Sequence, residues 1–286
     1  MAIEKQIWID LIKEGMTPDT SFLSRSVDMS DLVEHNKINL AEAGVEPNVI
    51  IDNKVYPVPT ASREDAPLEL PLHTFDTENT VVRNIEEKES AYPKMESVTR
   101  GHRRSLIRKT SANAAYNWCP TKDSDMTPVL AASGDISKAG YKKVSFEDFL
   151  NLEAKFRGLD VDMNSLVAVL NAYHLADLMA EDMKLYKEVL AAGKLFSFSL
   201  FSFNNTATFD GTTGQKKAYG AAADPTKDAI SSLVYCDTEV MRASGDTEIF
   251  VTYKDPKERG DILGFQQRFT ALPIRSKYIG AIYSGK

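Results

Sequence analysis

Two runs of alternating residues near the carboxyl end constrain the fold of this chain most. The first run has large apolar residues at every second position: Ile249, Val251 and Tyr253. The second run repeats this pattern over its own length, at Leu263, Phe265, Phe269 and Ala271. A period of two is typical of a strand with one buried face. Asp-Pro and Gly-Asp pairs between residues 255 and 261 indicate a turn, so the sequence predicts a long two-stranded ribbon built for packing.

Length and charge narrow the class of protein. The chain has 286 residues, so we expect a body with extended appendages or two small linked domains. No run approaches the ~18 apolar residues of a membrane span, and the amino terminus lacks the features of a signal peptide, so neither a membrane nor export is expected. A net charge of −7 argues against a surface that grips DNA phosphates. Cys119 and Cys236 are expected to be reduced packing residues in a cytosolic setting.

The first 44 residues predict an arm. Residues 3–14 have the pattern of a short amphipathic helix whose apolar side includes Ile7, Trp8 and Leu11. This helix would either dock on a neighbouring subunit or cover the core of its own chain. Residues 19–44 have no clear period and are interpreted as an extended arm.

Residues 45–90 predict a long hairpin rich in proline. Asp52-Asn53 lies between two β-prone runs and suggests a turn, while the prolines confine these strands to sheet edges. The expected tip is residues 60–70, which includes Arg63, Glu64 and Asp65. Because an isolated two-stranded ribbon is marginal in water, this hairpin needs a contact partner.

Residues 94–118 predict a long helix without proline, about 25 residues or roughly 37 Å in length. Its apolar stripe is thin, and much of its remaining surface is basic, at Arg100, Arg103, Arg104, Arg108 and Lys109. These cations would form either a solvated helix face or a docking surface for acidic residues of an adjacent copy, such as Glu64-Asp65 or Glu86, Glu87 and Glu89.

The remaining sequence predicts a mixed α/β body. Ser145 is expected to cap a helix that ends at Gly158, and residues 166–170 a short buried strand. One helix is expected from residue 175 to Gly193, with an apolar stripe at Leu175, Leu178, Met179, Met183, Tyr186, Val189 and Leu190. Residues 195–203 alternate as a strand, residues 204–226 form a loop, and residues 229–235 form another strand.

The sequence contains only weak candidates for catalytic or metal-binding motifs. The nearest constellation is His174 with Asp177 and Glu181 on one helix face, but a lone histidine at a helix start is more often structural. The run from Gly211 to Lys217 lacks the spacing of a phosphate loop, and Asp123-Ser124-Asp125 lacks the rest of a calcium loop. We therefore expect no catalytic residue, no metal and no cofactor.

The order of these elements resembles the major capsid proteins of tailed bacteriophages, which have the Hong Kong 97-like fold. Residues 79–118 resemble the hairpin return and spine helix of that family. Residues 165–203, SLVAVLNAYHLADLMAEDMKLYKEVLAAGKLFSFSLFSF, resemble its axial-domain strand, helix, Gly-Lys turn and strand. Residues 251–283, with their Asp-Pro turn and Gly-Asp pair, resemble its final strands.

The resemblance implies an α+β fold with an N-terminal arm, an extended β-hairpin (E-loop), a long spine helix, and peripheral and axial domains. The implied division is 1–44 N-terminal arm, 45–90 E-loop, 91–164 peripheral domain with the spine helix, 165–245 axial domain and 246–286 return strands of the peripheral domain. The candidate subunit-interface residues are Ile7, Trp8, Leu11, Arg63, Glu64, Asp65, Arg100, Arg103, Arg104 and Arg108.

The implied function is structural rather than enzymatic. Copies of the chain would self-assemble in the host cytoplasm into hexamers and pentamers of an icosahedral phage head that encloses double-stranded DNA without sequence-specific binding. Portal and scaffolding proteins are the further partners implied, and the presence of Met1 suggests a separate scaffolding protein or none. Three alternatives stay open: an encapsulin-like compartment shell, a cytosolic α+β enzyme using His174, Asp177 and Glu181, and a head-completion or tail protein.

Overall fold

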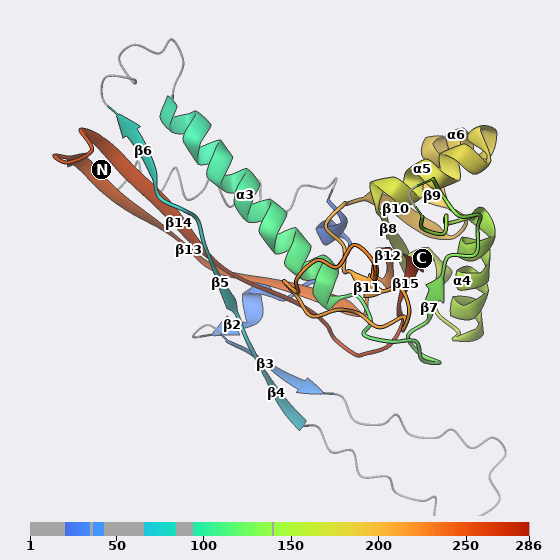
Figure 1. The fold of residues 1–286 in the computed structure, drawn as a ribbon. Helices are drawn as coiled ribbons and strands as arrows, with labels where there is room; N and C mark the ends of the chain where they lie inside the picture. The colour runs from blue at the N-terminus through green and yellow to red at the C-terminus, as the bar shows by residue number, and fades with distance from the viewer. Residues whose placement is uncertain (1–20, 35–36, 43–65, 84–93, 139, 286) are drawn as a thin grey trace, which may run out of the picture.

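The computed structural model describes residues 21–34, 37–42, 66–83, 94–138 and 140–285. The described strands form three sheets, and Figure 1 shows a rounded body at one end, a long ribbon extending from it and a second ribbon that departs from the first. The described helices are α3 (Lys94–Asn117), α4 (Phe146–Gly158), α5 (Ala172–Glu181) and α6 (Met183–Ala192), with short 3-10 turns η1 (Phe22–Ser24), η2 (Ser30–Leu32) and η3 (Met163–Ser165). None of these helices is long and apolar enough to cross a membrane.

The body is built on a seven-stranded sheet with the order β7-β15-β12-β8-β10-β9, in which β11 also pairs with β12. Its strands are β7 (Val129–Ala131), β8 (Leu166–Leu170), β9 (Lys194–Leu195), β10 (Phe198–Ser202), β11 (Phe209–Asp210), β12 (Asp228–Cys236) and β15 (Ile279–Ser284). The predicted strand at residues 166–170 is confirmed as β8, which is buried at every position. Such burial requires cover on both faces of the sheet.

Helices cover the two faces of this sheet differently. On one face, Leu166, Ala168 and Leu170 pack with residues of α4, α5 and α6. On the other face, Val167 and Val169 pack with the carboxyl end of α3 and with Trp118, which has no exposed surface. The helix α3, which we call the spine helix, therefore reaches into the core of the body.

The predicted carboxyl-terminal ribbon is confirmed. β13 (Val240–Asp255) and β14 (Gly260–Pro273) pair antiparallel, with Ile249 opposite Phe265 and Val251 opposite Leu263. β5 (His73–Asp76) and β6 (Thr80–Arg83) pair with β14, and β1 (Val27–Asp28) pairs with β13. The apolar face of this five-stranded sheet packs against α3, which lies along the ribbon in Figure 1.

The hairpin prediction needs correction at both its start and its tip. β3 (Lys37–Glu42) pairs antiparallel with β4 (Ala66–Pro71), and β2 (Val33–Glu34) pairs with β3. The ribbon therefore includes residues that we predicted to be part of the arm. Ile38 and Leu40 do alternate with polar or small neighbours, but this run is too short to predict a strand. Residues 66–70, expected at the tip, belong to a strand, while the predicted turn at residues 52–53 lies outside the described residues.

Two of the predicted helices are confirmed nearly to the residue. α3 ends at Asn117, and α4 begins after Ser145 and ends at Gly158. The Ser145 side chain accepts a hydrogen bond from the backbone N–H of Asp148, whose carboxylate accepts one from the backbone N–H of Ser145. This reciprocal capping box satisfies two backbone groups that a helix start would otherwise leave unpaired.

The single helix predicted from residue 175 to Gly193 is wrong. Asp182 has an extended backbone and its side chain accepts hydrogen bonds from the N–H groups of Lys184 and Leu185, so it ends α5 and caps α6. The predicted apolar stripe splits there, and three of its members are exposed: Met179, Met183 and Leu190. Gly193 does end α6, in the left-handed conformation expected of it.

The predicted strand at 195–203 is also interrupted. Phe196 has a positive φ of 53° and lies in the turn between β9 and β10, where its side chain is exposed. The alternation of aromatic residues with serine continues only from Phe198, which is buried. The strand predicted at 229–235 is confirmed as β12.

Candidate subunit-interface surfaces

The spine helix presents one face to the ribbon and another to solvent. On the packed face, Leu106 is buried with Leu263 and Phe265 of β14, and the His102 ring lies 5.2 Å from the Phe265 ring. Burial lowers the pKa of His102 from its ordinary value. As predicted, the apolar stripe is thin, and small polar residues such as Thr110 complete the buried face.

The exposed face of α3 is a basic ridge. Arg100, Arg104 and Arg108 follow one another at intervals of four residues, which places them on the same side of the helix. Arg100 lies 3.9 Å from Glu96 as an exposed pair, while no ion pair of Arg104 or Arg108 occurs among the described residues. Arg103 is half-buried and lines a hollow with Arg100. We call Arg100, Arg104 and Arg108 the arginine ridge.

The other candidate interface residues cannot be placed. Six of the ten predicted positions lie outside the described residues: Ile7, Trp8, Leu11, Arg63, Glu64 and Asp65. The acidic residues 86, 87 and 89, expected to face the basic helix of an adjacent copy, also lie outside them. The structure therefore brings together only the arginines of α3.

Residues 22 and 23 anchor the start of the described chain on the body, which no pattern in the sequence predicted. Phe22 and Leu23 are buried, and the Phe22 ring contacts Trp118 at 5.9 Å and Phe203 at 5.2 Å between centroids. The Tyr235 hydroxyl donates a hydrogen bond of 2.8 Å to the Phe22 carbonyl. Residues 19–44 are therefore not all extended arm, because a short turn in them fills a core position.

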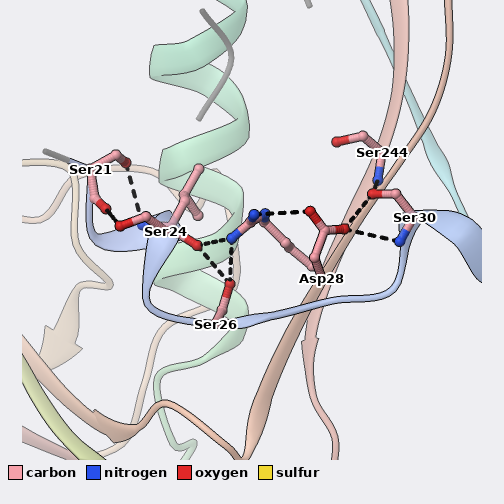
Figure 2. Close-up of polar contacts among 8 residues, drawn as sticks. Ser21, Ser24, Ser26, Asp28, Ser30 and Ser244 are labelled. Atoms are coloured by element: carbon pink, nitrogen blue, oxygen red, sulfur yellow. Dashed lines mark hydrogen bonds and ion pairs between the residues drawn. The ribbon is translucent and has the colours of Figure 1, made fainter. Parts of the chain in front are cut away.

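A polar network continues this anchor along β13 (Figure 2). The Arg242 guanidinium donates hydrogen bonds to the Leu23 carbonyl, to Ser26 Oγ at 3.2 Å and to Asp28 Oδ2 at 2.9 Å. The other Asp28 oxygen accepts from the N–H and hydroxyl of Ser30. Burial by itself raises the pKa of Asp28, but the bonds from Ser30 and Arg242 outweigh it and hold that pKa below its ordinary value.

A loop of the body is docked on the end of the spine helix. Lys216 lies after β11, and its ammonium group donates to the carbonyls of Tyr116 and Cys119 and lies 4.4 Å from the centre of the Tyr116 ring. Burial lowers the pKa of Lys216 and raises that of the Cys119 thiol to about 12. Both cysteines are free and buried, as predicted for packing residues.

Between this loop and α3 lies an open hollow of about 450 Å³. Arg108 and Lys109 line it from the helix, and Asn205 and Lys217 line it from the body. Lys217 is neutralised by Asp228, 2.5 Å away, so the charge that remains comes from the helix. The arginine ridge therefore ends at this polar hollow.

The helices α5 and α6 carry several exposed apolar side chains. Large side chains with more than a third of their surface exposed gather on these two helices: Tyr173, Met179, Met183, Leu185 and Leu190. Three of them, Met179, Met183 and Leu190, belong to the predicted stripe that the break at Asp182 divides. Scattered exposed apolar residues are ordinary, but several on one helix pair indicate a contact surface.

The constellation considered for an enzyme does not form a site. His174 has no exposed surface, and its two ring nitrogens lie 2.6 Å from Ser232 Oγ and 3.0 Å from Ser284 Oγ. Asp177 accepts from the backbone N–H of Val144, and Glu181 accepts from that of Phe146. Each side chain is thus committed to a structural hydrogen bond, and burial lowers the pKa of His174 to about 4.

An α+β body, the long helix α3 set along a ribbon and a second ribbon make up the arrangement of the described residues. The particular fold is the Hong Kong 97-like fold that the sequence resemblance implied.

Comparisons with solved structures carry this assignment. The capsid of Ralstonia phage GP4 superposes with a TM-score of 0.68 at 10% identity, over 95% of this chain and 90% of that one. A chain of Mycobacterium phage Che8 gives 0.59 at 14% identity, over 93% and 92%. The virus-like particle from Pyrococcus furiosus gives 0.60 at 10% identity, over 98% and 99%. No family model and no curated protein matches the sequence.

Proposed function

We propose that this chain is the major capsid protein of a tailed bacteriophage. Its copies would assemble into hexamers and pentamers of an icosahedral head that encloses double-stranded DNA, and the protein would reside in the virion. The observation that carries this proposal is the likeness to the capsid of Ralstonia phage GP4 over nearly the whole of both chains. A structural role without catalysis agrees with the hydrogen bonds that occupy His174, Asp177 and Glu181.

The physical argument concerns contacts between copies. A ribbon such as β3–β4 is marginal in isolation, so its stability in a shell would come from apolar surface buried on neighbours. The exposed residues of α5 and α6 and the arginine ridge supply further surface of two different kinds. Many modest contacts, each repeated on every copy, add up to a stable container.

The five-part division implied by the resemblance is kept as part of this proposal, although β3 from the proposed arm pairs with β4 from the proposed E-loop. The ten candidate interface residues also remain proposals, as do assembly in the host cytoplasm and contacts with portal and scaffolding proteins. Six of the ten lie in the first twenty residues or between residues 43 and 65, where appendages would cross onto neighbours.

A second candidate function is a compartment shell of the encapsulin kind. The observation that favours it is the likeness to the virus-like particle from Pyrococcus furiosus, which extends over 98% of this chain and 99% of that one. Both candidates share the fold and differ in what the shell holds.

Electron microscopy of the purified protein tests both. A phage capsid protein expressed with its neighbouring head genes should yield large closed heads, and expressed alone it should yield hexamers, pentamers or shells. Small uniform shells that form without any other phage protein and retain host enzyme would favour the compartment. A protein that stays monomeric by light scattering at high concentration would contradict both.

A further inference from the structure

β13 has a long edge that no other strand covers in the part of the chain that the structure describes. β1 pairs only with Met241 and Arg242, and the N–H of Ser244 donates to Ser30 Oγ. Beyond that point β13 pairs with β14 alone among the described strands. Register shifts after Ser244 and after Thr252 delimit a regular stretch from Thr247 to Thr252.

The hydrogen-bond pattern of β14 tells which groups of β13 point outward. The N–H of Phe265 donates to Thr77 Oγ1 and its carbonyl accepts from the N–H of Thr77, both at 2.9 Å, so Phe265 faces β5 and β6. Backbone groups alternate sides along an antiparallel strand, so Gly264 faces β13 and bonds to Phe250. The N–H and carbonyl groups of Ile249 and Val251 therefore point away from β14, and no described residue bonds to them.

The other end strands of the described sheets either contain proline or are no more than four residues long. β4 contains Pro67 and Pro71, which lack an N–H and discourage a further strand. β7 and β9 are only three and two residues long. The stretch of β13 from Thr247 to Thr252 has neither proline nor lysine and is not short. The stretch carries one charge, at Glu248, and is bounded by the two register shifts, but its regular edge without proline or lysine can still pair with another chain.

An exposed aromatic residue lies at the centre of this edge. Phe250 is 53% exposed on the sheet face opposite α3, while its neighbours Ile249 and Val251 pack toward the helix. Across the ladder Phe250 faces Gly264, which has no side chain, and the Asn79 amide lies over that glycine. A cross-strand aromatic pair would bury this ring from the open side.

We propose that the β13 edge pairs antiparallel with the same edge of a second copy, about a two-fold axis through Phe250. Ile249 of each copy would lie opposite Val251 of the other, and each such pair would exchange two backbone hydrogen bonds. The two Phe250 residues would face each other in a non-hydrogen-bonded pair, with Cα atoms about 4.5 Å apart. We assign β13 of the second copy as the partner strand. Among the described strands, only the β13 edge is regular, long and free of proline.

This inference rests on the proposed self-assembly. The contact is small, since an isolated pair of strands is marginal in water, so we expect it within assembled particles and not as a free dimer. A two-fold contact uses identical surfaces on both copies, which suits a shell whose capsomers meet across such axes.

Cysteine cross-linking tests the register. Phe250→Cys should form a disulfide with its own counterpart in assembled particles under mild oxidation, because a Cα separation near 4.5 Å is within disulfide range. The product is read as a dimer band on a non-reducing gel. The native cysteines are buried, so wild-type protein should give no such band.

Matched variants on the same sheet face serve as controls. Glu248→Cys and Thr252→Cys should not cross-link singly, but the two variants mixed before assembly should, since residue 248 would lie opposite residue 252 of the other copy. Cross-linking of Thr252→Cys with itself would overturn this register. Shells that form normally without any Phe250→Cys dimer would overturn the inference and leave the proposed function standing, whereas monomeric wild-type protein would overturn both.

Proline substitution tests the backbone contact independently. Ile249→Pro removes an N–H that the β14 ladder does not use, so the subunit should still fold. Its melting temperature should fall somewhat because Ile249 also packs toward α3, and Ile249→Ala controls for that loss. The yield of closed shells should fall about tenfold or more, because both copies lose a bond at every two-fold contact. Unchanged yield from a folded Ile249→Pro variant would show that the edge stays unpaired in the shell, which contradicts the proposal.

Discussion

Polar side chains hold together parts of this chain that are distant in sequence. Arg242 on β13 bonds to Leu23, Ser26 and Asp28, more than two hundred residues earlier. His174 on α5 joins Ser232 on β12 to Ser284 on β15. Hydrogen bonds of this kind add modestly to stability when made, but leaving either partner unpaired in the core is costly.

His174 predicts how stability depends on pH. Its pKa is lowered from 6.5 to about 4 in the folded protein, so below pH 6.5 the unfolded chain takes up a proton that the folded chain does not. Stability from this group is therefore complete above pH 6.5 and falls as the pH drops toward 4. His174→Gln should reduce the difference in unfolding free energy between pH 7 and pH 5, as measured by urea denaturation.

The exposed histidine His73 provides the control for this measurement. His73→Gln should leave the pH dependence of the wild type in place. If His174→Gln also keeps the full wild-type pH dependence, then other groups cause the acid sensitivity and the assignment to His174 is wrong.

At the scale of elements, the end of the spine helix and the loop after β11 form one unit. Lys216 donates to two carbonyls at the end of α3 and lies over the Tyr116 ring, while the Tyr116 hydroxyl donates to the Lys217 carbonyl. A cation at a helix carboxyl end also interacts favourably with the helix dipole. The loop is thereby fixed against α3 although it has little regular structure of its own.

Loss of this contact should be measurable. Lys216→Met should lower the free energy of unfolding by about 1–3 kcal/mol, the usual cost of removing hydrogen bonds from a charged donor. Lys122→Met, at an exposed lysine nearby in the sequence, is the matched control and should change stability by less than about 0.5 kcal/mol. Equal values for the two variants in urea denaturation would mean that Lys216 does not hold the loop.

At the scale of the whole molecule, we expect the arginine ridge to contact another copy of the chain. Arg104 has no ion-pair partner among the described residues, so its charge is available to an acidic surface of another copy. Arg104→Glu should therefore slow assembly, followed by light scattering, at low ionic strength. Because exposed charges are screened by salt, the defect should shrink as sodium chloride rises toward 1 M.

Lys277→Glu, a reversal at another exposed cation, controls for the change in net charge. Assembly of this control should match the wild type at each salt concentration. An Arg104→Glu variant that assembles as well as the control at low salt would leave the ridge as a solvated helix face, which was the other interpretation of these residues.

Local patterns determined much of the fold from sequence alone. The ribbon of β13 and β14, the spine helix, α4 with its Ser145 cap and the buried strand β8 all follow from periods and caps that involve neighbouring residues. The exposed positions of Arg100, Arg104 and Arg108 follow in the same way from helical spacing. Such features are legible because each depends on only a few consecutive residues.

The tertiary structure alone decided the rest. The place of Phe22 in the core, the pairing of β3 with β4 and the bonds of His174 depend on residues far away in the chain. The break at Asp182 depends on neighbouring residues, because the Asp182 side chain caps α6. The apolar stripe continues across this position, however, and so predicted a single helix. The open edge of β13 also needed the structure, because a strand's pattern shows which face is buried and not which edge lacks a neighbour.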